Sequence, residues 1–218
     1  MAFRILMRGG VYGLFIVGVL ITWLMKKAPK QQNRISKKSL QTEMSQDEAL
    51  LALKNPDWHM RLSAVQALSR YPSDQTLAAL LLVVGDIDPD IREIVGHVIE
   101  AYQSTAVPGL ISLLDHEENI GREAAVQILG RIADQEATLG IIQALQKDES
   151  AWVRISAVEQ LGKIHNLQST TALIQALQDE HPDVNRAVRK ALEAIGTPKA
   201  LQAIQEKHSR TVDNPSVP

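Results

Sequence analysis

The sequence predicts an all-α protein: an α-solenoid of about five helix pairs preceded by a single transmembrane helix. Three observations favour this fold. One segment recurs five times, with its second position at residues 61, 92, 122, 154 and 185. Between its copies lies a second run, in which apolar residues follow the helical spacing i, i+3, i+4 and i+7. A stretch without charge lies near the N-terminus. A fixed period of this length indicates stacked units that share one core.

The first predicted elements are a short tail, residues 1–8, and the transmembrane helix, residues 9–25. The 17 residues of the second segment carry no charge, and as a helix they would span about 25 Å, just enough to cross a bilayer. Tyr12 and Trp23 lie near its ends, where aromatic rings favour the membrane interface. A cleaved signal peptide and an ordinary core helix are the alternatives, but no small-x-small cleavage site follows the apolar run.

A basic linker is predicted next, over residues 26–45. Residues 1–38 contain 8 basic residues and no acidic one, a net charge of +8, whereas residues 39–218 contain 15 basic and 25 acidic residues, a net charge of −10. Because most of the basic residues follow the apolar stretch, we expect a single-pass membrane protein with the repeat domain on the cytoplasmic side. The linker is expected either to rest against anionic headgroups or to act as a topology signal and solvated spacer.

Two further expectations follow from this distribution of charge and glycine. The acidic repeat domain is not expected to bind nucleic acid, because neutralising phosphates requires a cationic face. Gly9 and Gly13 form a Gly-x-x-x-Gly step at the start of the apolar stretch, which weakly indicates self-association of the span.

The repeat domain is predicted over residues 46–207 as one elongated domain of short helix pairs. Its first-helix runs are rich in Leu and Ala, which are strong helix formers. The breaks between helices contain Pro, Asp, Ser and Asn, which cap helices or preset turns; they are Asn55–Asp57, Pro72–Asp74, Asp88–Asp90, Asp148–Ser150 and His181–Asp183. The tail, residues 208–218, has no apolar period and is predicted to be disordered.

The repeated unit carries a family resemblance. A run Leu-x-x-Leu-Leu-x-Asp, a short turn and then Val-Arg-x-x-Ala-x-x-x-Leu-Gly-x-Ile resembles the HEAT repeat, of the type first associated with phycobiliprotein lyases; the best copy is Ile174–Asp179 followed by Val184–Gly196. The resemblance covers residues 46–207 and implies a solenoid, but HEAT arrays serve many functions. Asn185 replaces the repeated Arg and Gly121 replaces an apolar residue, and we expect both to weaken packing locally.

The resemblance also implies that the second helix of each pair lines the concave side of the array. We expect a partner protein to bind there through the outward positions of these helices, with an ordinary solvated face as the alternative. These positions are Leu62, Gln66, Glu93, His97, Glu123, Gln127, Ile155, Glu159, Arg186 and Lys190. Leu62 and Ile155 are apolar where solvent is expected, which favours a partner contact.

The repeated arginine is expected to have a structural role. By the same resemblance, it should form a ladder between neighbouring units by reaching acidic groups of the turns, such as Asp57, Asp90, Glu118 and Asp148. The ladder residues are Arg61, Arg92, Arg122 and Arg154. Trp58 and Trp152, near the starts of two second helices, are expected to pack against the protein rather than to bind a ligand.

No catalytic residue, cofactor or metal site is predicted. The absence of Cys excludes thiolate metal sites. His116-Glu117 is similar to the His-Glu pairs of deoxyhypusine hydroxylase, a HEAT-like di-iron enzyme, but that family uses several pairs and this sequence has one, in a turn. The predicted function is therefore a membrane-anchored scaffold for partner proteins. A lyase-like or chaperone-like factor that handles a chromophore or its acceptor protein is the alternative.

Overall fold

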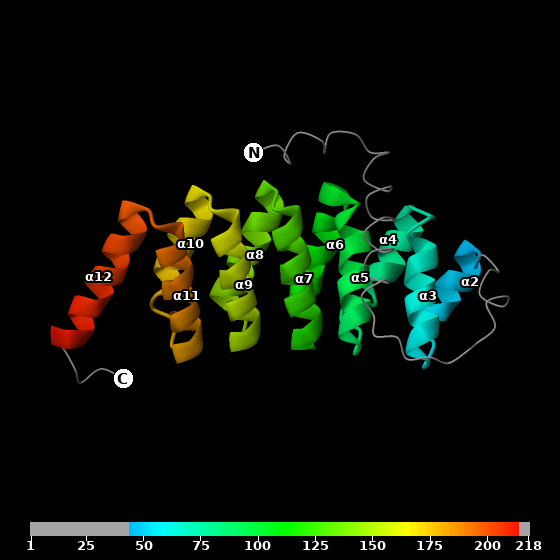
Figure 1. Cartoon of the computed structure of the whole chain (residues 1–218), viewed down its shortest axis with the longest axis horizontal. Coiled ribbons are helices and arrows are strands. Elements are labelled where there is room, and N and C mark those ends of the chain that lie inside the picture. The colour runs from blue at the N-terminus through cyan, green and yellow to red at the C-terminus, as the bar shows by residue number, and fades with distance from the viewer. Residues whose placement is uncertain (1–43, 214–218) are drawn as a thin grey trace, which may run out of the picture. The chain divides into compact units, whose positions relative to one another are not determined.

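The structure, a computed structural model, describes residues 44–213, and over this range every regular element is a helix. The predicted all-α, solenoid-like fold is confirmed there. The chain divides into two compact units, the first ending at Tyr102 and the second beginning at Gln103, whereas the sequence analysis predicted one continuous repeat domain. Figure 1 shows the helices of both units.

Unit 1 consists of two helix pairs: α2 (Gln46–Ala52) with α3 (Trp58–Leu68), and α4 (Asp74–Leu81) with α5 (Pro89–Glu100). The first helices begin at serine caps, because the Ser45 and Ser73 hydroxyls accept hydrogen bonds from backbone N–H groups of the first turn. The second helices α3 and α5 pack against each other. Leu68, Leu80 and Ile99 are among the fully buried side chains of this unit.

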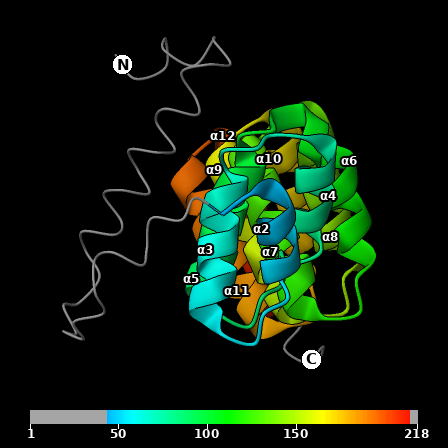
Figure 2. The ribbon, with the colours of Figure 1, turned by 90° about the vertical axis from the view of Figure 1, so that its right-hand side faces the viewer.

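Unit 2 has the same alternation of first and second helices, and its second helices are longer than those of unit 1. Its elements are η1 (Gln103–Ala106), α6 (Val107–Ser112), η2 (Leu113–Asp115), α7 (Asn119–Ile132), α8 (Gln135–Lys147), α9 (Ala151–Ile164), α10 (Leu167–Ala176), α11 (Pro182–Ile195) and α12 (Pro198–Asp213). Helix α9 packs against both α7 and α11, so the second helices form one layer of this unit, and α6, α8 and α10 form the other (Figure 2). Leu129, Leu161 and Leu192, one from each second helix, are fully buried in the shared core.

The layer of second helices in unit 2 depends on small residues at the points of closest approach. A Cβ added to Gly130 of α7 would lie 2.5 Å from the Gln160 side chain of α9, and one added to Gly162 would lie 3.3 Å from Ala191 of α11. Gly130 and Gly162 stand at the same position of successive repeats. The contacts therefore join residues about one repeat apart in sequence, near the C-terminal ends of neighbouring second helices.

Parts of the predicted domain organisation differ from the structure or fall outside it. The prediction that the disordered tail begins at residue 208 is wrong, since α12 is helical through Asp213. The predicted tail 1–8, the transmembrane helix 9–25 and nearly all of the linker 26–45 lie outside the described residues, as do residues 214–218. Within residues 44–213, no helix is long and apolar enough to cross a bilayer.

Candidate functional site

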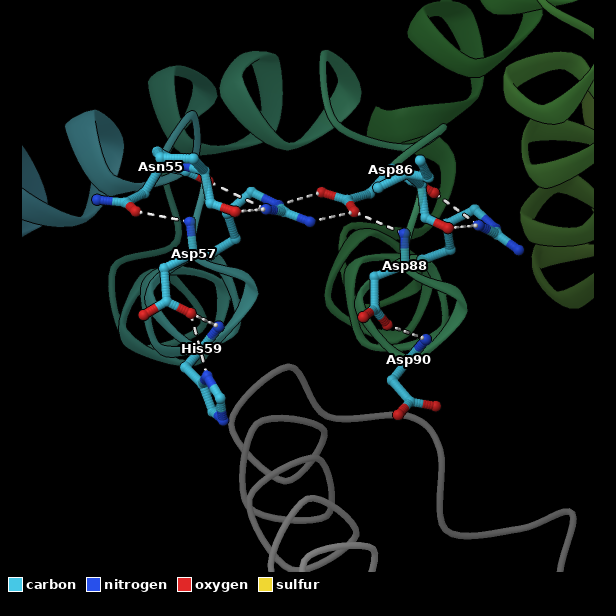
Figure 3. A network of polar contacts seen from close by, with 10 residues as sticks. Asn55, Asp57, His59, Asp86, Asp88 and Asp90 are labelled. Atoms are coloured by element: carbon cyan, nitrogen blue, oxygen red, sulfur yellow. Dashed lines mark hydrogen bonds and ion pairs between the residues drawn. The ribbon is translucent and has the colours of Figure 1, made fainter. Parts of the chain in front are cut away.

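The turn that leads into each second helix has a repeated geometry. The residue two places before the helix N-cap accepts a hydrogen bond from the backbone N–H of the N-cap, an Asx-type turn. Asn55 and Asp86 do this in unit 1, at 2.9 Å and 2.8 Å, as do Asp148 and Asp179 in unit 2, both at 2.8 Å. Figure 3 shows the two copies of unit 1, in which the Asn55 and Asp86 side chains point at the turn backbone. In the remaining copy the ring Nδ1 of His116 takes the place of the carboxylate oxygen.

The repeated arginine closes the same turn from the other side. In each copy its Nη1 donates to the carbonyl oxygens of two turn residues five and six positions earlier. Arg61 binds the carbonyls of Asn55 and Pro56, and Arg122 binds those of His116 and Glu117. Arg92 and Arg154 make the equivalent pairs of bonds, at distances from 2.6 Å to 3.2 Å. These carbonyls cannot bond within a helix, so the arginine satisfies acceptors that would otherwise need water.

Three of the arginines also reach the turn of the following repeat. Nε and Nη2 of Arg61 donate to the two carboxylate oxygens of Asp86, at 2.7 Å and 2.9 Å. Arg122 binds Asp148 at 2.8 Å and 3.0 Å, and Arg154 binds Asp179 at 2.8 Å and 2.9 Å. All six side chains are largely buried. Such bidentate pairs fix direction as well as distance, so each joins two successive repeats within its unit.

The acidic partners differ from those expected from the sequence. Asp148 does bind Arg122, but Asp57, Asp90 and Glu118 are not ladder partners, so that part of the prediction is wrong. Asp57 is the N-cap of α3 and accepts from the His59 N–H. Its carboxylate is therefore engaged in capping its own helix. The carboxylates that the arginines bind, those of Asp86, Asp148 and Asp179, instead lie two residues before an N-cap.

Burial and the ladder have opposing effects on two of these carboxylates. Burial raises the pKa of Asp86, but the hydrogen bonds from Arg61 and from the Asp88 N–H outweigh it and hold the pKa below its ordinary value. For Asp179, burial again raises the pKa, and the bonds from Arg154 and from the His181 N–H lower it further than burial raises it. Both side chains are therefore ionised partners of an arginine at neutral pH.

The ladder changes at Asn185, where the other repeats have arginine. The Asn185 Nδ2 donates to the Asp179 carbonyl at 2.6 Å, which preserves the contact with the turn. Its Oδ1 accepts from Nζ of Lys207 in α12, also at 2.6 Å. Asn185 thus joins α11 to α12 through a lysine instead of an aspartate. The expectation that Asn185 weakens the ladder is therefore only half right, because a different bond replaces the missing one.

Gly121 departs from the pattern together with His116. A Cβ added to the buried Gly121 would lie 3.3 Å from Nδ1 of His116, so the imidazole lies over the site that an apolar side chain occupies in other repeats. The ring also accepts the turn hydrogen bond from the Glu118 N–H at 3.1 Å. His116 therefore acts as a turn residue, and in the described part of the chain no group of His, Asp or Glu side chains could hold a metal ion.

The predicted partner-binding positions lie on the second helices with unequal exposure. In unit 1, Glu93 is exposed, whereas Leu62, Gln66 and His97 are half-buried. Nε2 of His97 lies 3.8 Å from Oε1 of Glu93, and its Nδ1 lies 3.5 Å from Oε2 of Glu100.

The equivalent positions of unit 2 show the same mixture. Glu123 and Ile155 are half-buried, and the exposed positions are Gln127, Glu159, Arg186 and Lys190. Gln127 is joined to Glu123 by a hydrogen bond, and Arg186 to Asp183 by an ion pair. Because Leu62 and Ile155 are partly covered, they give less support to a partner contact than the sequence indicated.

Exposed apolar side chains lie elsewhere; they include Trp58 and Trp152, which the sequence prediction considered, and Ile120, which it did not single out. Trp152 is 70% exposed, so the expectation that it packs against the protein is wrong. Trp58 is 41% exposed and stacks on His59 with ring centroids 3.8 Å apart. Ile120 is 42% exposed and holds the same helical position in α7 as Trp152 in α9. Only the equivalence of positions 120 and 152 between repeats could have revealed this pair from the sequence.

Comparisons with known proteins agree with the repeat architecture. Residues 138–214 match the family model for HEAT repeats, and residues 121–147 match that for the PBS lyase HEAT-like repeat. No curated protein matches the sequence.

Among solved structures, the complex of CpcE and CpcF of phycocyanin lyase from Nostoc sp. PCC7120 matches with a TM-score of 0.53 and 21% identity, over 65% of this chain and 91% of that one. A structure described as the basis of microtubule plus end tracking by XMAP215, CLIP-170 and EB1 matches with a TM-score of 0.52 and 16% identity, over 77% and 91%. At these identities the likeness extends to the fold alone.

Proposed function

We propose that this protein is a membrane-anchored HEAT-repeat scaffold that binds a partner protein through the outward face of its second helices. The observation that carries the proposal is the buried arginine–aspartate ladder. It couples α7 to the turn before α9, and α9 to the turn before α11. Adjacent packed helices lie about 8–10 Å apart, so the ladder holds side chains of successive repeats at fixed spacing. A surface ordered before binding loses less entropy on association.

The chemistry of that face suits protein recognition. Along unit 2 its exposed charges change from acidic, Glu159 of α9, to basic, Arg186 and Lys190 of α11. A small-molecule site would instead need a concave, largely apolar pocket with a few converging polar groups. A surface that changes from acidic to basic favours a partner with the opposite order of charges, because complementary potentials select the partner and speed its encounter.

Variants of this face test the binding proposal. Glu159→Lys together with Lys190→Glu makes the α9 position basic and cancels the net positive charge of the two α11 positions. Glu136→Lys at the exposed start of α8 is the matched control because α8 belongs to the other layer. Proximity labelling from the C-terminus of the full chain in its native host should identify neighbours that the double variant loses and the control keeps. Equal labelling by all three proteins would refute binding through this face.

A second function is supported by the match of residues 121–147 to the PBS lyase HEAT-like repeat and by the fold likeness to a phycocyanin lyase complex. On this alternative, the protein handles a chromophore or its acceptor protein. Co-expression of the full chain with a phycobiliprotein subunit and a bilin source tests it. Visible absorbance on the acceptor that depends on this chain supports the alternative, whereas partner binding with no pigment transfer supports the scaffold.

A further inference from the structure

We propose that the turn edge of unit 2 is a second docking surface, which binds a basic segment of a partner protein carrying a large apolar side chain. By the turn edge we mean the surface formed where α7 and α9 begin, namely Glu117, Glu118, Ile120, Glu149 and Trp152. It lies at the ends of the second helices, whereas the face described above runs along their length. The proposal extends the scaffold function by naming the chemistry of a partner.

Two exposed apolar side chains occupy equivalent positions at the starts of neighbouring helices on this edge. Ile120 and Trp152 are both the second residue of their helices. Arg122 near the start of α7 binds Asp148 just before α9, and Gly130 near the end of α7 lies against Gln160 near the end of α9. The two helices are therefore parallel, and their starts are neighbours. Single exposed apolar residues are ordinary on protein surfaces, but adjacent ones indicate an interaction site. Trp is also among the residues that contribute most to binding at interfaces.

Three acidic residues precede this pair by two or three positions in the sequence. Glu117, Glu118 and Glu149 are exposed, and among residues 44–213 only Glu149 of the three contacts a cation, with its carboxylate 3.5 Å from Nη2 of Arg122. The cations that lie closest in sequence to these acids do little to cancel them. Arg122 and Arg154 are buried and paired with Asp148 and Asp179, so Lys147 at the end of α8 is the exposed basic residue of these turns.

The ladder explains why the carboxylates remain available. A glutamate next to an exposed arginine would commonly pair with it, but here the arginines are turned inward by the turn carbonyls and the aspartates. The edge therefore presents a negative field around an aromatic face. Lysine and arginine side chains fit both features, because they pair with carboxylates and their cations are attracted to the face of an indole. An apolar residue between them would cover Ile120.

Binding of a defined peptide tests the surface. The probe is a fluorescently labelled twelve-residue peptide that alternates Lys-Leu-Arg, and the comparison peptide has Ser in place of Lys and Arg. With the full chain we expect the basic peptide to bind, the serine peptide not to bind, and the affinity to fall with added salt. Binding should weaken about tenfold or more in Trp152→Ser and in Glu117→Lys combined with Glu118→Lys.

Matched controls separate the edge from general stickiness. Leu167→Ser removes a 75% exposed apolar side chain at the start of α10, and Glu136→Lys reverses a charge at the start of α8. Both sites lie at the starts of first helices, on the edge of the unit opposite to the starts of α7 and α9. These controls should bind like the unaltered protein, with circular dichroism verifying the fold of every variant.

Equal weakening by edge variants and controls, or equal binding of both peptides, would overturn the proposal. Loss of peptide binding in the edge variants, with labelling through the second-helix face unchanged, would support this surface independently of the other one.

Discussion

At the scale of single residues, the arginine–aspartate pairs of the turns are the most informative feature of this protein. Arg61, Arg122 and Arg154 each serve their own turn and the next one, so removing one of them takes the arginine donor from two carbonyl oxygens and leaves a largely buried carboxylate with only a backbone N–H. The sequence identified the arginines by their period but assigned three of four partners wrongly. Period alone does not tell which carboxylate of a turn faces the previous repeat, because that depends on which one serves as the N-cap.

The first prediction concerns the buried pair Arg122–Asp148. We expect Arg122→Ala to lower the free energy of unfolding by about 3–5 kcal/mol, because it leaves a buried charge without its partner. Arg186→Ala is the control, since its ion pair with Asp183 is exposed and should contribute less than about 1 kcal/mol. Urea unfolding of the two variants measures the difference, and similar losses would contradict a structural role for the ladder.

The second prediction follows from the lowered pKa values of Asp86 and Asp179. A carboxylate whose pKa is lower in the folded state stabilises the protein above its unfolded pKa of about 3.9 and loses that contribution as the pH falls through the folded value. The free energy of unfolding should therefore decrease as the pH is lowered below about 4. Asp179→Asn should be less stable at pH 7 and lose less stability on acidification. An unchanged pH profile in Asp179→Asn would contradict this assignment.

At the scale of helices, the boundaries predicted from the sequence were good where capping residues mark them and poor where they do not. Ser73 and Asp88 begin helices at the expected breaks. The predicted C-terminal helix ended too early, at residue 207, because the residues that follow carry little apolar pattern although α12 continues to Asp213. The close approach of second helices at Gly130 could not be predicted either, since it depends on the side chain of a residue in the next repeat.

Gly130 provides the third prediction. A Cβ at this position would come within 2.6 Å of the Cβ and Cγ atoms of Gln160, near the base of that side chain, so the two helices would have to separate. We expect Gly130→Ala to cost about 1–3 kcal/mol despite the higher helix propensity of alanine. Gly162→Ala, at the same position of the next repeat with a 3.3 Å contact to Ala191, should cost clearly less. Thermal unfolding of both variants measures the two losses of stability, and a larger loss in Gly162→Ala than in Gly130→Ala would contradict the prediction.

The fourth prediction concerns the ends of α7, α9 and α11, each of which is followed by a residue with left-handed backbone. Ala133 and His165 have φ of 53° and 55°, and Gly196 has φ of 65°. A residue with a side chain is strained there by about 1–2 kcal/mol, and glycine is not. His165→Gly should therefore raise the free energy of unfolding by about 0.5–1 kcal/mol, whereas Gly196→Ala should lower it. Chemical denaturation tests both, and a destabilised His165→Gly variant would show that the imidazole itself contributes to the cap.

At the scale of the whole molecule, the repeat class was predictable because five copies of one pattern leave few alternatives. The function was less predictable from the sequence than the repeat class. The helical period predicts which side chains point outward from one helix but not which of them a neighbouring helix covers, as the half-buried Leu62 and Ile155 illustrate. The exposed pair Ile120 and Trp152 depends on the packing of the repeats, because only the structure shows that both side chains, at equivalent helix positions, are exposed.

The last prediction tests the proposed anchor. If residues 9–25 span the bilayer, the full chain should stay with membranes through high salt and alkaline carbonate, because burial of apolar side chains in lipid does not depend on screened charge. A chain lacking residues 1–25 should move to the soluble fraction. Replacing the six basic residues of 26–38 by Gln separates the two contributions. A spanning helix keeps that variant on the membrane, whereas attachment through headgroup charge alone would release it, and would also release the full chain in salt. Fractionation of the three chains therefore distinguishes an integral protein from one held at the surface by its positive charge.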